Sequence, residues 1–310
     1  MIFQLRHATE YAYAGRVELA AHVVHLRPRE LPWQRVHRFT LDISERAARL
    51  TGAIDHFGNP VHRLFLDHDH PALSVVSEAV VQLLPRPAAP NPAATPAWEN
   101  VAVMAQLADV ARDVAEFAFA TQMAPALPEA AEWAASSFRP GRPILACLLD
   151  LLARLARDFR FQPGVTTVST SVGRVLQLRA GVCQDFAHLM IAALRALRLP
   201  ARYVSGYVQT RPPPGMARLR GADQSHAWVS CWLGPDGGWI DLDPTNELIV
   251  DQEHICLGWG RDYADVSPVH GVLLGGGGHT IAVSVDMEPV FQGSTCGLPE
   301  NTSPPISLAK

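Results

Sequence analysis

The clearest periodic pattern in the chain is an apolar stripe between residues 183 and 198. Apolar side chains recur there at helical spacing, at Phe186, Leu189, Met190, Ala193, Leu194 and Leu197. This spacing predicts a buried helix that can continue as far as Pro200, the first residue that would break it. Gly181 precedes the stripe and can adopt the backbone conformation of a tight entry turn. The pattern therefore places Cys183 at or just before the first turn of a buried helix.

Short β-type runs separated by turn signals dominate the first 84 residues. The runs are Ile2–Leu5, Val23–Leu26, Phe39–Ile43 and Leu73–Val76. Several short strands at this spacing predict a small β-sandwich or barrel. Residues 85–98 then hold five prolines among alanines, which is the composition of a semi-rigid linker. We expect an N-terminal β-rich domain at residues 1–84 and a domain boundary in the linker at 85–98.

Helical periodicity returns after the linker. One predicted helical face carries Val103, Leu107, Val110, Val114 and Phe117. A second helix is expected from Leu145 to Phe159, with Cys147 in the core, and a short one at 172–179 leads to the central helix.

The pattern changes to strands after Pro200. Strands are expected at 201–208, 225–233 and 239–244, with a hairpin turn at 234–238 and a Pro- and Gly-rich loop at 211–223. A last strand is expected at 279–285. Helices followed by antiparallel strands predict an α+β second domain at 99–288, and residues 289–310 are expected to form a flexible tail.

Composition and charge exclude several classes of function. The 310 residues are 48% apolar and 18% charged, with a net charge of −4. A soluble globular chain fits these values, and nothing in the charge favours nucleic acid as a partner. No apolar run reaches the length of a membrane span, and no signal peptide is recognisable. The five cysteines are scattered, and their spacing suggests neither disulfides nor a zinc site. We therefore expect a reduced, cytoplasmic protein without a cofactor, a metal or a membrane partner.

Cys183, His226 and a following aspartate occur in the order of a thiol protease. Unpaired N–H groups at a helix start favour a thiolate at Cys183. His226 opens a predicted strand and can accept the thiol proton, and a carboxylate on the next strand can orient the imidazole. Strand periodicity turns Cys231 away from His226. It does not separate Asp241 from Asp243, because residues two apart share a face. The alternative for Cys183 is an ordinary buried cysteine.

Four segments resemble the bacterial transglutaminase-like family. They are Gly181–His188, Pro200–Tyr207, Ser225–Val229 and Trp239–Asn246, and the first domain is similar to the N-terminal domain of these proteins through Leu26–Pro28, Asp55–Asn59 and His70. Residues 260–268 are similar to the C-terminal signature of the family. The resemblance covers about residues 1–288. It implies a papain-like α+β core, with Cys183 as nucleophile, His226 as base and Asp243 as the orienting acid.

The resemblance leaves the reaction open, because the superfamily includes crosslinking enzymes, peptidases and deglycosylating amidases. All attack an amide carbonyl and form a thioester, which water hydrolyses or an amine aminolyses. We expect a cysteine peptidase or amidase acting on peptides or proteins. The alternatives are a protein-glutamine transamidase, a catalytically inactive binding module, and a structural protein whose β domain recruits a partner. The oligomeric state is not predicted.

Overall fold

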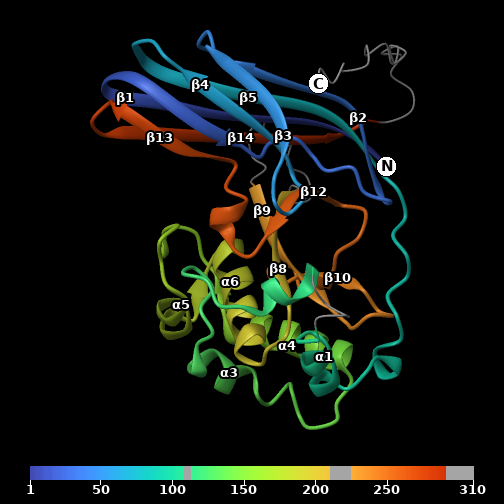
Figure 1. Cartoon of the computed structure of the whole chain (residues 1–310). Helices are drawn as coiled ribbons and strands as arrows, with labels where there is room; N and C mark the ends of the chain where they lie inside the picture. Colours follow the sequence, from blue (N-terminus) through green and yellow to red (C-terminus); the bar gives the residue numbers. More distant parts are fainter. Residues whose placement is uncertain (108–112, 210–224, 291–310) are drawn as a thin grey trace, which may run out of the picture.

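The structure, a computed structural model, describes residues 1–107, 113–209 and 225–290. A curled antiparallel sheet lies across one end of a second unit, in which helices pack on a smaller antiparallel sheet (Figure 1). The predicted α+β class and the β-rich N-terminal part are both present. Within the described residues, no helix is long and apolar enough to cross a membrane.

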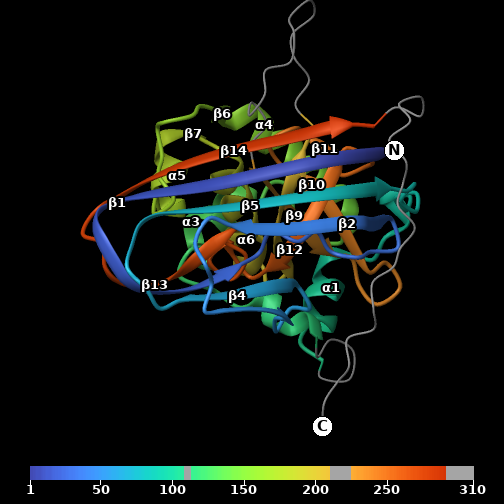
Figure 2. The ribbon, with the colours of Figure 1, turned by 90° about the horizontal axis from the view of Figure 1, so that it is seen from above.

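The first sheet has seven strands and is organised on one long strand. Its members are β1 (Ile2–Val24), β2 (Gln34–Ile43), β3 (Arg49–Ile54), β4 (Pro60–Leu66), β5 (His70–Leu83), β13 (Val269–Gly275) and β14 (His279–Pro289). The first half of β1 pairs with β5 and β14, and its second half pairs with β4 and β13. The expected β-sandwich or barrel thus takes the form of one curled sheet (Figure 2).

The placement of residues 269–288 in the second domain is corrected by this topology. These residues form β13 and β14, and both strands pair with β1 of the first sheet. The physical reason is the length of β1: 23 residues of strand offer a full second side of hydrogen-bonding groups. Local periodicity predicts that a segment is a strand, but it carries no information on which sheet the strand joins.

The second unit contains the predicted helices and hairpin. Its helices are α1 (Trp98–Met104), α3 (Pro128–Ala134), α4 (Ile144–Asp158), α5 (Val172–Leu178) and α6 (Cys183–Ala196). Its sheet holds β8 (Ala201–Val208), β9 (Ser225–Trp232), β10 (Trp239–Asp243), β11 (Leu248–Ile249) and β12 (His254–Gly260), in the order β11-β10-β9-β8-β12. Short elements complete it: β6 (Arg160–Phe161), β7 (Ala180–Gly181), and the 3-10 turns η1 (Pro92–Ala94), η2 (Glu116–Ala118) and η3 (Tyr263–Asp265).

The central helix α6 is buried around its whole circumference. Leu189, Met190 and Ala193 are fully buried, and the helix contacts α3, α5, β8 and β9. Even Arg195 is buried, and its guanidinium donates hydrogen bonds to the carbonyls of Phe117, Ala124 and Ala201. A buried charge is tolerated only when its donors are satisfied in this way. The apolar stripe of the sequence therefore becomes the core of the second unit.

One predicted helical face differs from the structure. Helix α1 ends at Met104, and Val103 and Leu107 are 59% and 48% exposed, whereas Val101 is fully buried. Neighbouring side chains on this helix, not those of the predicted stripe, thus face the core. Val110 lies outside the described residues, as do the predicted loop at 211–223 and residues 291–310 of the predicted tail.

Two side-chain amides of the first unit bind the outer edge of β12, which is the edge strand of the second sheet. Gln34 accepts from the Cys256 N–H and donates to the Cys256 carbonyl, both at 2.8 Å. Asn59 accepts from the Trp259 N–H at 2.9 Å and donates to the Trp259 carbonyl at 2.8 Å. Each amide replaces, for one residue, the hydrogen bonds that a neighbouring strand would make. The two sheets are held together by these contacts.

The surroundings of Asn59 fix this contact. The guanidinium of Arg29 lies 3.5 Å from the centre of the Trp259 ring and donates to the Asn59 side chain. Asp55 accepts from the Asn59 amide at 2.7 Å. A Cβ at Gly258 would lie 2.8 Å from the Asn59 carbonyl oxygen, so only glycine lets the amide approach β12 this closely. The segment Asp55–Asn59, noted in the sequence as a family feature, is therefore an interdomain contact.

Replacing Asn59 by alanine should lower the free energy of unfolding by about 3 kcal/mol, because the buried polar groups of Trp259 and Asp55 lose their partners. Chemical denaturation measures the change. The matched control is Asn100→Ala, since Asn100 is exposed, and this variant should unfold like the parent protein. Equal stability of the two variants would show that the amide contact does not hold the sheets together.

Candidate active site

Cys183 is the first residue of α6, as the sequence predicts. Its side chain is partly exposed, whereas residues 185–195 of the helix are buried. Asp185 caps the start of this helix, because its carboxylate accepts from the Val182 N–H at 2.8 Å and from the Thr166 hydroxyl at 2.6 Å. Cys183 sits where free backbone N–H groups and the helix dipole favour negative charge.

His226 reaches Cys183 from the second strand of the sheet. It lies at the start of β9, is buried, and lines the same cavity as Cys183. The ring Nε2 is 2.7 Å from Oδ2 of Asp243. Nδ1 is therefore the ring nitrogen that Asp243 does not bind and the one left to interact with Cys183. The three residues proposed from the sequence come together as one series, in which His226 bonds Asp243 and shares a cavity with Cys183.

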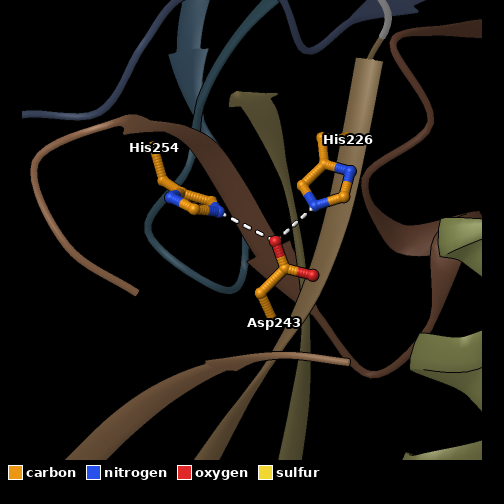
Figure 3. Close-up of side chains that lie close together, drawn as sticks. All are labelled: His226, Asp243 and His254. Atoms are coloured by element: carbon orange, nitrogen blue, oxygen red, sulfur yellow. Dashed lines mark hydrogen bonds and ion pairs between the residues drawn. The ribbon is translucent and has the colours of Figure 1, made fainter. Parts of the chain in front are cut away.

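Asp243 is fully buried and has five hydrogen-bond partners. Its Oδ2 atom binds Nε2 of His226 and Nε2 of His254 (Figure 3). Oδ2 also accepts from the side-chain amide of Asn246, and Oδ1 accepts from the backbone N–H groups of Thr245 and Asn246. The turn after the strand, Pro244–Asn246, thus wraps around the carboxylate. These contacts give a physical reason for the sequence Asp-Pro-Thr-Asn at the end of β10.

The charges of this series follow from its hydrogen bonds. Burial alone lowers the pKa of His226, but the bonds to Asp243 and Cys183, together with their charges, outweigh burial and raise that pKa to about 9. Burial alone would raise the pKa of Asp243, but the bonds to His226 and His254 and the charge of His226 hold it far below its usual range. An imidazolium and a carboxylate therefore coexist at neutral pH in a buried site.

The two aspartates that periodicity could not separate have different partners. Asp241 forms an ion pair with Arg86 at 2.9 Å, and Arg86 lies over the ring of Trp33. Asp241 thus binds the segment between the two units, whereas Asp243 binds His226. The geometry favours Asp243 as the carboxylate that orients the imidazole.

His254 is a site residue that the sequence did not reveal. It lies at the start of β12, is buried, and its Nε2 atom is 2.9 Å from Oδ2 of Asp243. Strands β12 and β10 are not neighbours in the sheet, so residue spacing gives no signal for this contact. Only the return of the chain from β11 to the sheet edge brings His254 to the carboxylate.

The other described cysteines and His188 have structural positions. Cys147, Cys231 and Cys256 are buried, and burial raises all three thiol pKa values, to about 11 for Cys147 and about 12 for Cys256. Cys231 packs in the helical core, away from His226 as predicted. His188 accepts from the Tyr263 N–H, and burial lowers its pKa to about 4, so it is a neutral core residue.

The donor groups of His226, Asp243 and His254 lie close enough together to be considered as a metal site. The separations of 2.7 and 2.9 Å between Oδ2 and the two ring nitrogens are, however, those of direct hydrogen bonds. A zinc ion bound by all three would need to replace both hydrogens, with ligand distances near 2.0–2.2 Å. The arrangement fits a hydrogen-bond network around a carboxylate better than a metal centre.

Cys183 and His226 line a cavity of about 260 Å³ between the two units. One wall comes from the second unit and includes Gln184, Tyr203 and Tyr263. The facing wall comes from the first sheet, through β1, β13 and β14. Cys183 therefore faces a cavity that residues of both sheets enclose.

Comparisons with known proteins agree with this fold and site. Residues 3–82 match the bacterial transglutaminase-like N-terminal region, and residues 139–244 match the transglutaminase-like superfamily. An uncharacterised protein of Mycobacterium tuberculosis is 40% identical over 300 residues, which is 94% of this chain and 93% of that protein.

Two further similarities have lower sequence identity. A protein-glutamine gamma-glutamyltransferase of Pseudomonas aeruginosa is 34% identical over 110 residues, which is 35% of this chain and 16% of that protein. A solved structure from Cytophaga hutchinsonii has a TM-score of 0.71 at 20% identity, over 94% of this chain and 92% of that one. The α+β fold with a papain-like core is thereby confirmed.

Iodoacetamide at pH 6.5 should alkylate Cys183 at least about tenfold faster than Cys147, Cys231 or Cys256, because only Cys183 is accessible beside an imidazolium. Peptide mapping by mass spectrometry measures the four rates. Protein unfolded in guanidinium is the control, and there the rates should converge. Equal rates in the folded protein, or faster labelling of Cys296 outside the described residues, would contradict the assignment.

Proposed function

Because the chain belongs to the transglutaminase-like superfamily, we propose that it is a thiol enzyme that cleaves amide bonds through a thioester on Cys183. The observation that carries this proposal is the series Cys183–His226–Asp243, with Cys183 at a helix start and at a cavity. Peptides or proteins are the proposed substrates. The cytoplasmic location stays a prediction from the sequence.

Each proposed step uses a group whose position is known. His226 holds the proton of the Cys183 thiol, and the thiolate attacks the carbonyl carbon of the amide. The resulting oxyanion lies near the N–H groups at the start of α6, which stabilise it. His226 then donates its proton from Nδ1 to the leaving amine, and the C–N bond breaks to leave a thioester. Asp243 keeps Nε2 protonated and the ring oriented throughout.

The second half-reaction regenerates the thiol. His226 accepts a proton from water as the water attacks the thioester carbonyl, the C–S bond breaks, and the sulfur recovers the proton from the imidazolium. An amine in place of water would give transamidation. Hydrolysis is the better-supported outcome, because no Asp or Glu is found among the described residues that line the cavity, so none is in place to bind a cationic lysine acceptor.

Transamidation is the second candidate. Its support is the similarity of about a third of this chain to the Pseudomonas aeruginosa enzyme named as a protein-glutamine gamma-glutamyltransferase. The Cytophaga hutchinsonii structure is described as a candidate cysteine protease. The names of these two proteins thus favour different reactions, transamidation and hydrolysis, and an experiment must distinguish the two.

A peptide library incubated with the full chain, with and without an added primary amine, tests the reaction. Mass spectrometry should detect hydrolysed peptides in both samples and little amine-labelled product, and Cys183→Ala should abolish both products. Predominant amine incorporation would establish the transamidase instead. If Cys183 is hyper-reactive but no peptide changes, the protein is a binding module and the proposal fails.

The two aspartate variants rank the roles of the carboxylates. Asp243→Asn should lower kcat/KM on one amide substrate by about three to four orders of magnitude, as loss of the orienting carboxylate does in triads of this kind. Asp241→Asn should lower it far less, because it removes only the ion pair with Arg86. Circular dichroism establishes that both variants are folded. The opposite ranking would transfer the orienting role to Asp241.

A further inference from the structure

One wall of the cavity beside Cys183 is a face of the first sheet that nothing in the proposed chemistry uses. The wall residues from this sheet include His7, Thr9 and Tyr11 on β1 and Ile281 and Val283 on β14. Strand pairing sets Tyr11 opposite Ile281, Thr9 opposite Val283 and His7 opposite Val285. Directly paired residues point to the same side of a sheet. These side chains therefore form one continuous surface, and β14 runs beside β1 along it (Figure 2).

This surface is covered at one end and open at the other. Val285 and Met287 on β14 are buried against Tyr207, Ile255 and Leu257 of the second unit. Two and four residues before Val285 on the same face, Val283 and Ile281 are 55% and 53% exposed. The second unit thus covers the apolar face of β14 up to the cavity. The next two side chains on this face, Val283 and Ile281, stay exposed and line the cavity that contains Cys183. Exposed apolar surface at a cleft commonly marks a binding site.

The polar side chains of His7 and Thr9 on this wall are already hydrogen-bonded within the protein. His7 bonds the Tyr207 hydroxyl at 2.8 Å through Nδ1 and the Thr9 hydroxyl at 3.0 Å through Nε2, and burial lowers the His7 pKa to about 4. No Asp, Glu, Lys or Arg occurs among the described residues lining the cavity. The wall therefore offers van der Waals contact without a charge. A charged group placed there would lose its hydration and gain no charged partner in return.

We propose that Tyr11, Ile281 and Val283 form a subsite of the active site that binds an uncharged aliphatic side chain on the acyl part of the substrate. The acyl part is the relevant one because it stays attached to Cys183 after the amine leaves, and the subsite adjoins Cys183 in the same cavity. The inference rests on the proposed function, and it gives the first domain a role in selecting substrate.

Peptidyl vinyl sulfones test the subsite without requiring turnover. The Cys183 thiolate adds to the β-carbon of the vinyl group, and a proton from His226 completes the adduct at the α-carbon. Intact-mass spectrometry measures second-order labelling rates for acetylated probes with glycine, leucine, glutamate or lysine next to the vinyl group. The leucine probe should react at least about tenfold faster than the glycine probe, and both charged probes should be slower than leucine.

Two variants and a control separate selection from folding. The double variant Ile281→Ser, Val283→Ser should lower the leucine-to-glycine rate ratio by roughly fivefold or more. Val272→Ser is the matched control, because Val272 is 70% exposed on the same sheet but does not line the cavity, and it should keep the ratio. Val283→Lys should make the glutamate probe faster than the lysine probe, a gain that a misfolded protein cannot show.

The outcomes distinguish the subsite from the reaction. If both cavity variants keep the probe preferences of the parent protein, the subsite proposal is wrong, whatever the amide assay gives. If the variants change the probe preferences as expected but the protein cleaves no amide, the subsite proposal holds and the proposed function is wrong.

A separate observation concerns His254. Its Nε2 atom bonds Oδ2 of Asp243, while its Nδ1 atom is buried without a hydrogen-bond partner among the described residues. The ring packs edge-on against Trp228, with centroids 5.3 Å apart. A carboxylate oxygen only accepts, so Nε2 must carry the proton. The one hydrogen bond of this buried histidine is thus directed at the atom that also binds His226.

We infer that His254 is a positioning residue that shares the charge on Oδ2 of Asp243 and so limits how tightly the carboxylate holds the His226 imidazolium. The groups facing His226 are Cys183 on α6, Asp243 on β10, and the rings of Trp228 on β9 and His254 on β12. Those facing Asp243 are His226, His254, Thr245 and Asn246. A catalytic imidazolium must release its proton to the leaving amine. Without the hydrogen bond from His254, the carboxylate of Asp243 would hold this proton on His226 more strongly.

His254→Phe should therefore raise the titration midpoint of His226, by roughly three- to tenfold in proton affinity, measured from the ring nitrogens by NMR and from the pH profile of Cys183 alkylation. His254→Gln, whose amide nitrogen can take the place of Nε2, should restore the midpoint of the parent protein. An unchanged or lower midpoint in the phenylalanine variant, with both variants folded by circular dichroism, would reduce His254 to a packing residue.

Discussion

The structure depends on how the free edge of β12 is satisfied. Gln34 and Asn59 of the first unit supply side-chain amides to backbone groups of Cys256 and Trp259, and no neighbouring strand is needed there. Buried backbone groups must be paired, so these amides tie the position of one sheet to that of the other. The cavity at Cys183 is lined by residues of both sheets, so the first domain forms part of the candidate active site.

A second constraint is the burial of Asp243. An isolated buried carboxylate would be costly, and five hydrogen bonds offset that cost here. The same bonds fix the carboxylate against His226 and keep the imidazole charged at neutral pH. The site is therefore preorganised by groups that never touch substrate: the turn after β10 orients the carboxylate, and the carboxylate orients the ring. In the proposed mechanism, the nucleophile is therefore activated before substrate arrives.

Where interpretation of the sequence was incomplete, the missing information was non-local. Periodicity identified β14 as a strand but could not tell that it completes the sheet of β1, because pairing partners lie more than 250 residues apart in the chain. The helix around Val103 was assigned the wrong face, since α1 is too short for an apolar stripe to define which side packs. His254 had no signal, because strand order and not spacing brings it to Asp243.

By itself, the sequence determined the elements whose signals are local. An apolar stripe that starts at Cys183 dictates a buried helix with the thiol at its positive end, and strand alternation dictates that His226 and Cys231 face opposite ways. Strand periodicity did not separate Asp241 from Asp243, because both share a face. The family resemblance favoured Asp243, and the tertiary structure gives the two carboxylates different partners, Arg86 for Asp241 and His226 for Asp243. It also decided that the first sheet closes the cavity, since contacts between distant segments are fixed by the fold as a whole and not by neighbouring residues.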